Sequence, residues 1–227
     1  MNILKISPPP HAKGSMSTQR VMLCVILALM PSVISAGYYF GLRAIMLIAL
    51  CILSCVLFEG LTRIIMKKEQ TIGDMSAVLT GILLALNLPV TLPFWQATIG
   101  CFVAIVIVKQ LFGGLGQNIM NPALAGRCFL LISFPGHMTN FAAPAAAHLV
   151  DTVSGATPLA AAKAGEQVNL LSMFLGNTTG TIGETSALAL LLGGIFLVCI
   201  HVIDLNIPLI YICLLYTSPS PRDVEES

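Results

Sequence analysis

Charged side chains are scarce in this 227-residue sequence, which holds 11 Lys and Arg and 10 Asp and Glu. They make up 9% of the chain, whereas roughly 25% of the residues in an ordinary soluble domain are charged. So few charges cannot cover the surface of a water-soluble globule, and this excludes that class. The net charge of +1 also leaves no basic surface for a polyanion, so we expect no nucleic-acid partner.

The sequence also lacks cysteines at metal-binding spacing. Its seven cysteines all lie inside apolar runs, and no two of them form a CxxC pair. We therefore interpret them as packing residues and predict no metal site.

The sequence also shows no cleavable signal peptide, because the first twenty residues include three consecutive prolines, and no small-residue cleavage site follows the first apolar run. We expect that run to remain as a membrane anchor.

Hydrophobic residues, by contrast, make up 56% of the chain and are concentrated in seven runs. A transmembrane helix needs about 20 mostly apolar residues, and the runs at 122–135 and 205–216 are short enough to be partial or broken spans. The other five runs lie at 21–40, 44–61, 75–92, 94–112 and 185–203. The pattern predicts an all-α polytopic membrane protein with about 6–7 transmembrane helices and one long extracytoplasmic loop.

The distribution of Lys and Arg predicts the orientation of these spans. With a cytoplasmic N-terminus, eight of these residues, Lys109 and Arg127 included, fall on the cytoplasmic side, and only Arg43 and Lys163 fall outside. Lys109 stands near the end of its run, where a long side chain can reach the headgroups. We predict a cytoplasmic segment (1–20), a membrane domain (21–135), an extracytoplasmic loop (136–184), a second membrane part (185–216) and a polar tail (217–227).

A compact motif stands in the predicted outer loop, with the sequence Asp-Thr-Val-Ser-Gly-Ala-Thr-Pro at residues 151–158. Gly155 and Ala156 keep the backbone slim, and Thr157 presents a hydroxyl before the bend fixed by Pro158. From the residues alone this is a turn, because a threonine hydroxyl is a weak nucleophile unless it is activated.

The motif resembles the D-x-x-(S/T)-G-A-T acceptor sequence of the Rnf D and Nqr B family. In that family a flavin transferase attaches FMN through its phosphate to the last threonine. Asp151, Ser154, Gly155, Ala156 and Thr157 all meet the pattern. The resemblance therefore implies covalent FMN on Thr157, attached by a flavin transferase acting on the outer side of the membrane.

A second stretch, residues 109–127 (KQLFGGLGQNIMNPALAGR), resembles the same family. Gly113, Gly114 and Gly116 permit a tight bend after an apolar helix. The GGLGQN segment is not a dinucleotide-binding fingerprint, because no strand precedes it and the last glycine of the GxGxxG pattern is missing. In the quinone-reducing relatives the matching asparagines lie near a non-covalent riboflavin. The resemblance thus makes Asn118 and Asn121 candidates for a second flavin, and a capping or packing role is the alternative.

Glu59 is the acidic residue inside the first four apolar runs. It lies four residues before Arg63, so the two can pair on one helix face near the cytoplasmic surface. An intramembrane carboxylate can also bind a cation in transit, and the matching region of the family contains a glutamate implicated in ion coupling. Both interpretations of Glu59 stay open at this point.

The resemblance favours the D subunit of the Rnf complex over the B subunit of the Nqr complex. It implies a bacterial inner-membrane subunit of an ion-translocating oxidoreductase, which passes electrons between flavins and partner subunits while Na⁺ or H⁺ moves. The alternatives are the Nqr B subunit and a flavin-free secondary transporter, which the Gly/Pro-interrupted segments suggest. Family members continue into further helices where this chain has its polar tail, so we expect the chain alone to be inactive as an enzyme.

Overall fold

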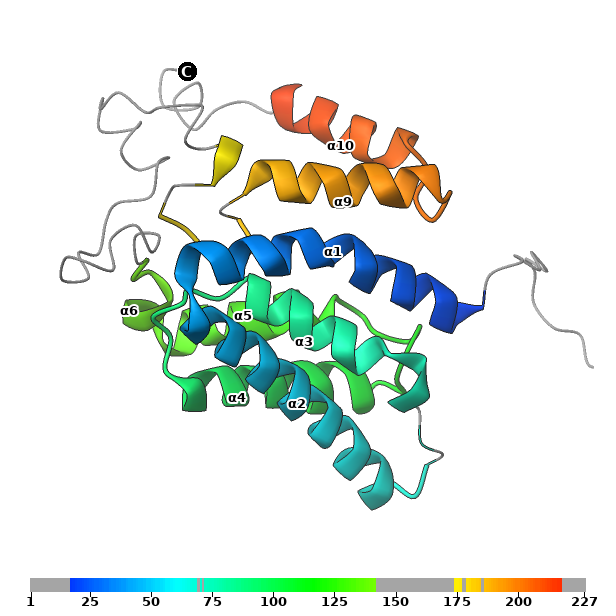
Figure 1. The fold of residues 1–227 in the computed structure, drawn as a ribbon. Helices are drawn as coiled ribbons and strands as arrows, with labels where there is room; N and C mark the ends of the chain where they lie inside the picture. Colours follow the sequence, from blue (N-terminus) through cyan, green and yellow to red (C-terminus); the bar gives the residue numbers. More distant parts are fainter. Residues whose placement is uncertain are drawn as a thin grey trace, which may run out of the picture.

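The computed structural model describes residues 17–68, 70, 72–141, 174–176, 179–184 and 186–217. These parts of the chain are helical and contain no strand (Figure 1). The helices are α1 (Thr18–Phe40), α2 (Leu42–Ile65), η1 (Ile72–Asp74), α3 (Ser76–Leu86), α4 (Phe94–Phe102), η2 (Val103–Gln110), α5 (Pro122–Ser133), α6 (Pro135–Met138), α9 (Ala187–Cys199) and α10 (Asn206–Thr217).

Each predicted apolar run contains a helix, but the helices differ in length. Among the described residues, α1 and α2 are the two helices that are long and apolar enough to cross a membrane. Helix α4 continues directly into η2, and α3, α5, α9 and α10 have only 11 to 13 residues each. The predicted all-α class is confirmed, whereas several of the predicted spans are represented by shorter apolar helices.

Helix α3 ends earlier than the apolar run at 75–92 predicted. Asn87 closes the helix, and its side-chain amide donates to the Leu83 carbonyl at 2.8 Å. Pro89 follows two residues later, and proline lacks a backbone N–H and disfavours helical geometry in the residue before it. The chain therefore turns between Asn87 and Pro93 before α4 begins.

The core lies where α2 packs against α3, α4 and η2. Its wholly buried members include Leu47, Cys51, Cys55, Cys101 and Ile105, so three of the cysteines fill the packing role predicted for them. Gly81 of α3 allows the two helix backbones to approach closely. A Cβ atom there would lie 2.8 Å from the Ile52 Cα and 2.9 Å from the Cys51 carbonyl oxygen. Small residues at such contacts are typical of membrane helices.

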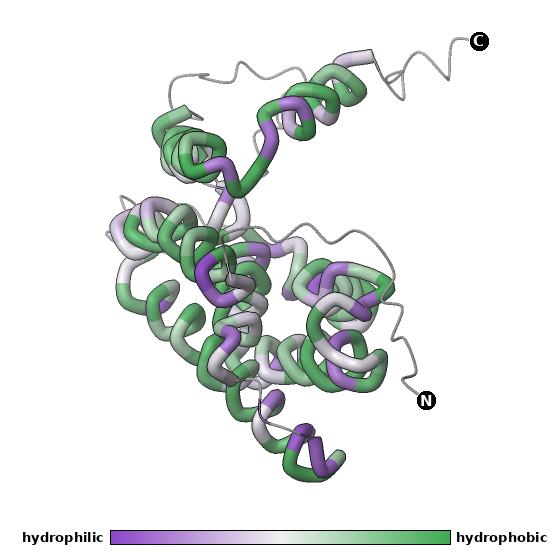
Figure 2. The backbone as a smooth tube through the Cα atoms, turned by 90° about the vertical axis from the view of Figure 1, so that its right-hand side faces the viewer, coloured by the Kyte–Doolittle hydropathy of each residue, from purple (hydrophilic) through white to green (hydrophobic). Residues whose placement is uncertain are grey.

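The outer surface is apolar as well. Leu53, Leu57 and Leu61 follow one another at four-residue spacing along α2 and are 62%, 69% and 60% exposed. Figure 2 shows the helices as predominantly hydrophobic along their length. A bundle with apolar residues both inside and outside fits a membrane protein, in which lipid covers the outer face.

The two ends of the bundle are distinguished by their polar contacts. At one end, Arg43 in the first turn of α2 donates to the Val90 carbonyl at 2.9 Å. Arg127 of α5 points to this same end, because its guanidinium donates to Asn87 Oδ1 at 2.9 Å and lies 3.8 Å from Glu184. The prediction that groups Arg127 with the cytoplasmic charges is therefore wrong, since Arg127 lies with Arg43.

Candidate functional site

A buried ion pair joins α2 to η2 near the opposite end of the bundle. Glu59 is 0% exposed, and both of its carboxylate oxygens lie 2.9 Å from Lys109 Nζ. Lys109 Nζ also donates to Ser76 Oγ at 2.7 Å, and Gln110 Nε2 donates to Glu59 Oε1 at 3.0 Å. Glu59, Ser76, Lys109 and Gln110 together are named the Glu59 cluster.

The geometry of η2 turns Lys109 and Gln110 toward Glu59 together. This segment is π-helical, and its wider hydrogen-bond pattern continues in the bond from Gly114 N to the Lys109 carbonyl at 2.9 Å. A wider coil rotates less per residue, so two consecutive side chains can face the same neighbour. Both are 1% exposed. The prediction that Lys109 reaches the headgroups is wrong, because its ammonium is paired inside the bundle.

Ser76 enters the cluster as the first residue of α3. The N-terminal end of a helix carries partial positive charge, which favours the nearby Glu59 carboxylate. A partner that the structure gives Glu59 is Lys109, which the sequence analysis did not predict. Glu59 and Lys109 are 50 positions apart, and no local spacing signals their contact. The predicted pair of Glu59 with Arg63 stays a prediction.

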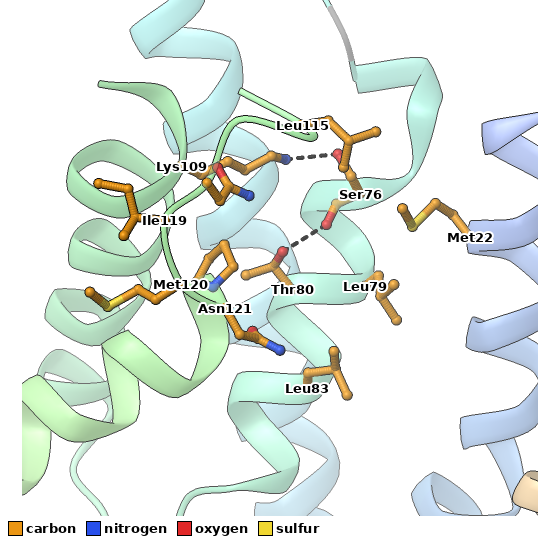
Figure 3. A pocket seen from close by; sticks show the side chains of 12 residues that line it. Met22, Ser76, Leu79, Thr80, Leu83, Lys109, Leu115, Ile119, Met120 and Asn121 are labelled. Carbon is orange, nitrogen blue, oxygen red and sulfur yellow. Dashed lines mark hydrogen bonds between the residues drawn. The ribbon is translucent and has the colours of Figure 1, made fainter. Parts of the chain in front are cut away.

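An open cavity of about 420 Å³ borders the Glu59 cluster, and Figure 3 shows the residues around it. This volume is within the range of small-molecule sites. Its polar lining consists of Ser76, Thr80, Lys109, Asn118 and Asn121. Its apolar lining consists of Met22 from α1, Leu79 and Leu83 from α3, and Leu115, Ile119, Met120 and Pro122. Figure 3 shows Lys109 and Thr80 both bonded to Ser76, through its hydroxyl and its carbonyl respectively.

The structure brings both candidate asparagines to this cavity but gives them different roles. Asn121 caps α5, because its Oδ1 accepts from the Ala123 N–H at 3.0 Å. The capping alternative is therefore confirmed for Asn121. Asn118 Oδ1 is buried and has no hydrogen-bond partner among the residues that the structure describes. Such an acceptor is costly to leave unpaired and is available to a bound molecule.

The glycine-rich connection that carries Asn118 follows the helical segment η2. This agrees with the sequence analysis, which rejected a dinucleotide-binding fingerprint because no strand precedes these glycines. Gly113, Gly114 and Gly116 all have positive φ, at 117°, 98° and 85°. Gly114 also passes close to Arg63, since a Cβ atom there would lie 2.7 Å from Arg63 Nη2. A residue with a side chain would strain both the backbone and this contact.

The predicted flavin-acceptor motif lies outside the described residues. This applies to Asp151, Ser154, Gly155, Ala156 and Thr157, and to most of the predicted loop at 136–184. Their role stays a prediction from the sequence.

Comparisons with known proteins show that the chain is similar to subunits of ion-translocating oxidoreductase complexes. It is 50% identical over 214 residues to the D subunit of the Na(+)-translocating ferredoxin:NAD(+) oxidoreductase complex of Acetobacterium woodii, covering 92% of this chain and 66% of that protein. It is 40% identical over 222 residues to the D subunit of the proton-translocating ferredoxin:NAD(+) oxidoreductase complex of Clostridium ljungdahlii, covering 93% and 67%.

A third relative, the D subunit of the ion-translocating oxidoreductase complex of Mannheimia succiniciproducens, is 35% identical over 254 residues, covering 93% of this chain and 72% of that protein. The chain thus spans about two thirds of the length of the curated relatives it matches. The model of the NQR2, RnfD, RnfE family matches residues 5–218. This match covers nearly the whole chain, and the chain therefore belongs to the NQR2, RnfD, RnfE family.

Proposed function

We propose that this chain is the membrane-embedded D subunit of an Rnf-type ion-translocating oxidoreductase complex, in which it passes electrons while Na⁺ or H⁺ crosses the membrane. The similarity to three proteins named as D subunits of such complexes, over more than nine tenths of this chain, carries the proposal. The buried Glu59 cluster supports it, because an ionisable pair inside an apolar bundle is typical of an ion pathway. The other membrane and redox subunits of such a complex are the proposed partners.

Covalent FMN on Thr157 is the second part of the proposal, supported by the complete acceptor motif. When bound, the isoalloxazine supplies the redox chemistry, and the protein supplies its placement and electronic tuning.

We predict that Thr157→Ala abolishes covalent flavin, since it removes the hydroxyl that would carry the phosphoester. The chain is expressed with its flavin transferase and denatured on a gel, and ultraviolet fluorescence and the mass of the loop peptide are recorded. Ser154→Ala is the matched control and should retain most of the signal. A Thr157→Ala peptide that still carries the flavin mass would exclude this assignment. Absence of flavin fluorescence from the unsubstituted chain would favour the flavin-free transporter.

A second, non-covalent flavin in the cavity is the third part. The residues fit such a group: apolar side chains can cover a ring system, and the unpartnered Asn118 Oδ1 can accept a hydrogen bond from a ring N–H. The hydroxyl of Thr80 supplies a polar contact at the same wall.

We predict that Asn118→Leu lowers the amount of riboflavin that acid releases from the purified protein, because it fills the cavity and removes the acceptor. Gln117→Leu is the matched control, because Gln117 is an exposed neighbouring amide outside the cavity lining. Equal riboflavin release from both variants would leave Asn118 with a packing role.

A further inference from the structure

The glycine-rich connection between η2 and α5 meets the bundle at Gly114. Of residues 111–117, all of which the structure describes, Gly114 is buried and the others are exposed. Its N–H donates to the Lys109 carbonyl at 2.9 Å, and its backbone lies against Arg63, since a Cβ atom there would stand 2.7 Å from Arg63 Nη2. An otherwise exposed segment is therefore docked onto the end of α2 at this glycine.

The contact between Arg63 and Gly114 is specific in shape. Arg63 lies in the last turn of α2 and is 8% exposed, so its guanidinium is enclosed where it meets the connection. A guanidinium is planar and can lie flat against a backbone that carries no side chain. Gly114 has a φ of 98°, a conformation that also favours glycine. Any larger residue at position 114 would displace the arginine.

The same connection brings Asn118 to the cavity. The Gly114 carbonyl accepts from the Gln117 N–H at 3.2 Å, which closes a turn directly before Asn118. On the other side, Asn121 is fixed as the cap of α5. Asn118 thus lies between two fixed points, with its buried Oδ1 in a residue that lines the cavity. A displacement at Gly114 would therefore move this acceptor.

We propose that Arg63 is a positioning residue for the cavity: through Gly114 it holds the connection against α2 and so keeps Asn118 Oδ1 in the cavity wall. Arg63 is not part of the cavity lining, so it acts through Asn118 and not by touching the bound molecule. The positioning follows from the contacts of the described residues, whereas its effect on a bound flavin rests on the function proposed above.

Two glycine variants isolate the contact. Gly114→Ala and Gly116→Ala both place a methyl group on a backbone with positive φ, at 98° and 85°, so they share the backbone strain. Nothing lies within 4 Å of the methyl group at position 116, whereas the one at position 114 meets Arg63. A difference between the two variants therefore reports the Arg63 contact.

The first measurement needs no ligand. Asn118→Cys is introduced into the full chain, from which the four cysteines outside the core have been removed, and the rate of its reaction with a maleimide is recorded in detergent. We expect Gly114→Ala to raise this rate about tenfold, because position 118 leaves its half-buried place when the connection shifts. Gly116→Ala should change the rate by less than about twofold.

The second measurement is the Kd for riboflavin, from the quenching of riboflavin fluorescence by chains that keep Asn118. A misplaced hydrogen-bond acceptor weakens binding, and we expect the Kd of Gly114→Ala to be about 3–10-fold above that of Gly116→Ala. Thermal unfolding of the same samples separates positioning from stability. A lower Tm for Gly114→Ala with an unchanged Kd and an unchanged reaction rate would mean that Arg63 only stabilises the fold, and would overturn the proposal.

Removing Arg63 tests whether the effect passes through it. In an Arg63→Ala background, Gly114→Ala should have no more effect than Gly116→Ala, because the methyl group no longer meets a side chain. If Arg63→Ala fails to fold, the two glycine variants alone decide.

Equal reaction rates for the two glycine variants would overturn the proposal, as would equal Kd values where both bind riboflavin. An effect of Gly114→Ala that persists without Arg63 would overturn it too. A difference in reaction rate in a chain that never binds riboflavin supports the positioning role while contradicting the second flavin. Riboflavin binding without a difference in reaction rate does the reverse.

Discussion

At the scale of single residues, the Glu59 carboxylate and the Lys109 ammonium lie in a chain where only 9% of residues are charged. Both groups are buried in the bundle. Gln110 also donates a hydrogen bond to the Glu59 carboxylate, and the Lys109 ammonium donates one to Ser76. A buried ion pair is often no more stabilising than well-packed apolar residues of the same volume, because both charges must leave water. Stability alone therefore does not account for the pair, and this favours the ionic role that the proposed function gives to Glu59.

We predict that Glu59→Gln destabilises the protein by about 3–5 kcal/mol, because Lys109 is left as a buried charge without its counter-ion. The small cost of an exposed surface pair does not apply to a carboxylate that is 0% exposed. Chemical denaturation in detergent measures the change. Combining Glu59→Gln with Lys109→Met removes the stranded charge and should recover much of the loss. If Glu59→Gln unfolds at the same denaturant concentration as the unsubstituted chain, the pair is not coupled as described.

At the scale of elements, hydrophobic runs located the helices, but turn chemistry set their lengths. The start of α5 follows from Asn121 and Pro122, a capping residue before a proline at the first helical position, and this pattern is visible in the sequence. The early end of α3 depends on Asn87 and Pro89, inside a run that looks continuous by hydropathy. The π-helical geometry of η2 has no signal in composition, so the inward direction of Lys109 could not be predicted.

We predict opposite effects for Gly81→Ala and Gly194→Ala, although both glycines lie inside helices. Alanine favours a helix by about 1 kcal/mol, and Gly194 has open space around the added methyl group, so that variant should be slightly more stable. At Gly81 the methyl group meets the α2 backbone, and we expect a net loss of about 1–3 kcal/mol. Thermal unfolding of the two variants side by side measures the difference. A stabilised Gly81→Ala protein would contradict the close α2–α3 contact.

At the scale of the whole molecule, the contacts separate an end with Arg43 and Arg127 from an end with the Glu59 cluster and the cavity. Because Arg127 lies at the end with Arg43, the predicted excess of positive charge at the N-terminal end is smaller than the sequence analysis counted. The excess is not reversed, since Arg20, Lys67 and Lys68 remain at the N-terminal end. The predicted cytoplasmic N-terminus therefore keeps its basis. The placement of the loop at 136–184 depends on it.

We predict that a cysteine at position 163 reacts with an impermeant maleimide in intact cells, whereas one at position 68 reacts only after lysis. The background lacks Cys24, Cys128, Cys199 and Cys213, and the remaining three cysteines are buried in the core. Lys68 is an exposed residue and serves as the matched control for the opposite side. The reverse labelling pattern would overturn the orientation and would place Thr157 away from an outer-face flavin transferase.

The position of Glu59 along α2 also has an electrical consequence. Glu59 lies six residues before Ile65, the end of a 24-residue helix, so it is about 9 Å from that end at 1.5 Å per residue. An ion entering from this side reaches the carboxylate after about a quarter of the helix length. Moving one charge across the full membrane potential involves about 2.3 kcal/mol per 100 mV, so this first step involves only about 0.6 kcal/mol. In the proposed function, an ion that pairs with Glu59 would therefore reach it with little dependence on voltage, and the work against the membrane potential would fall on the passage from Glu59 to the far side.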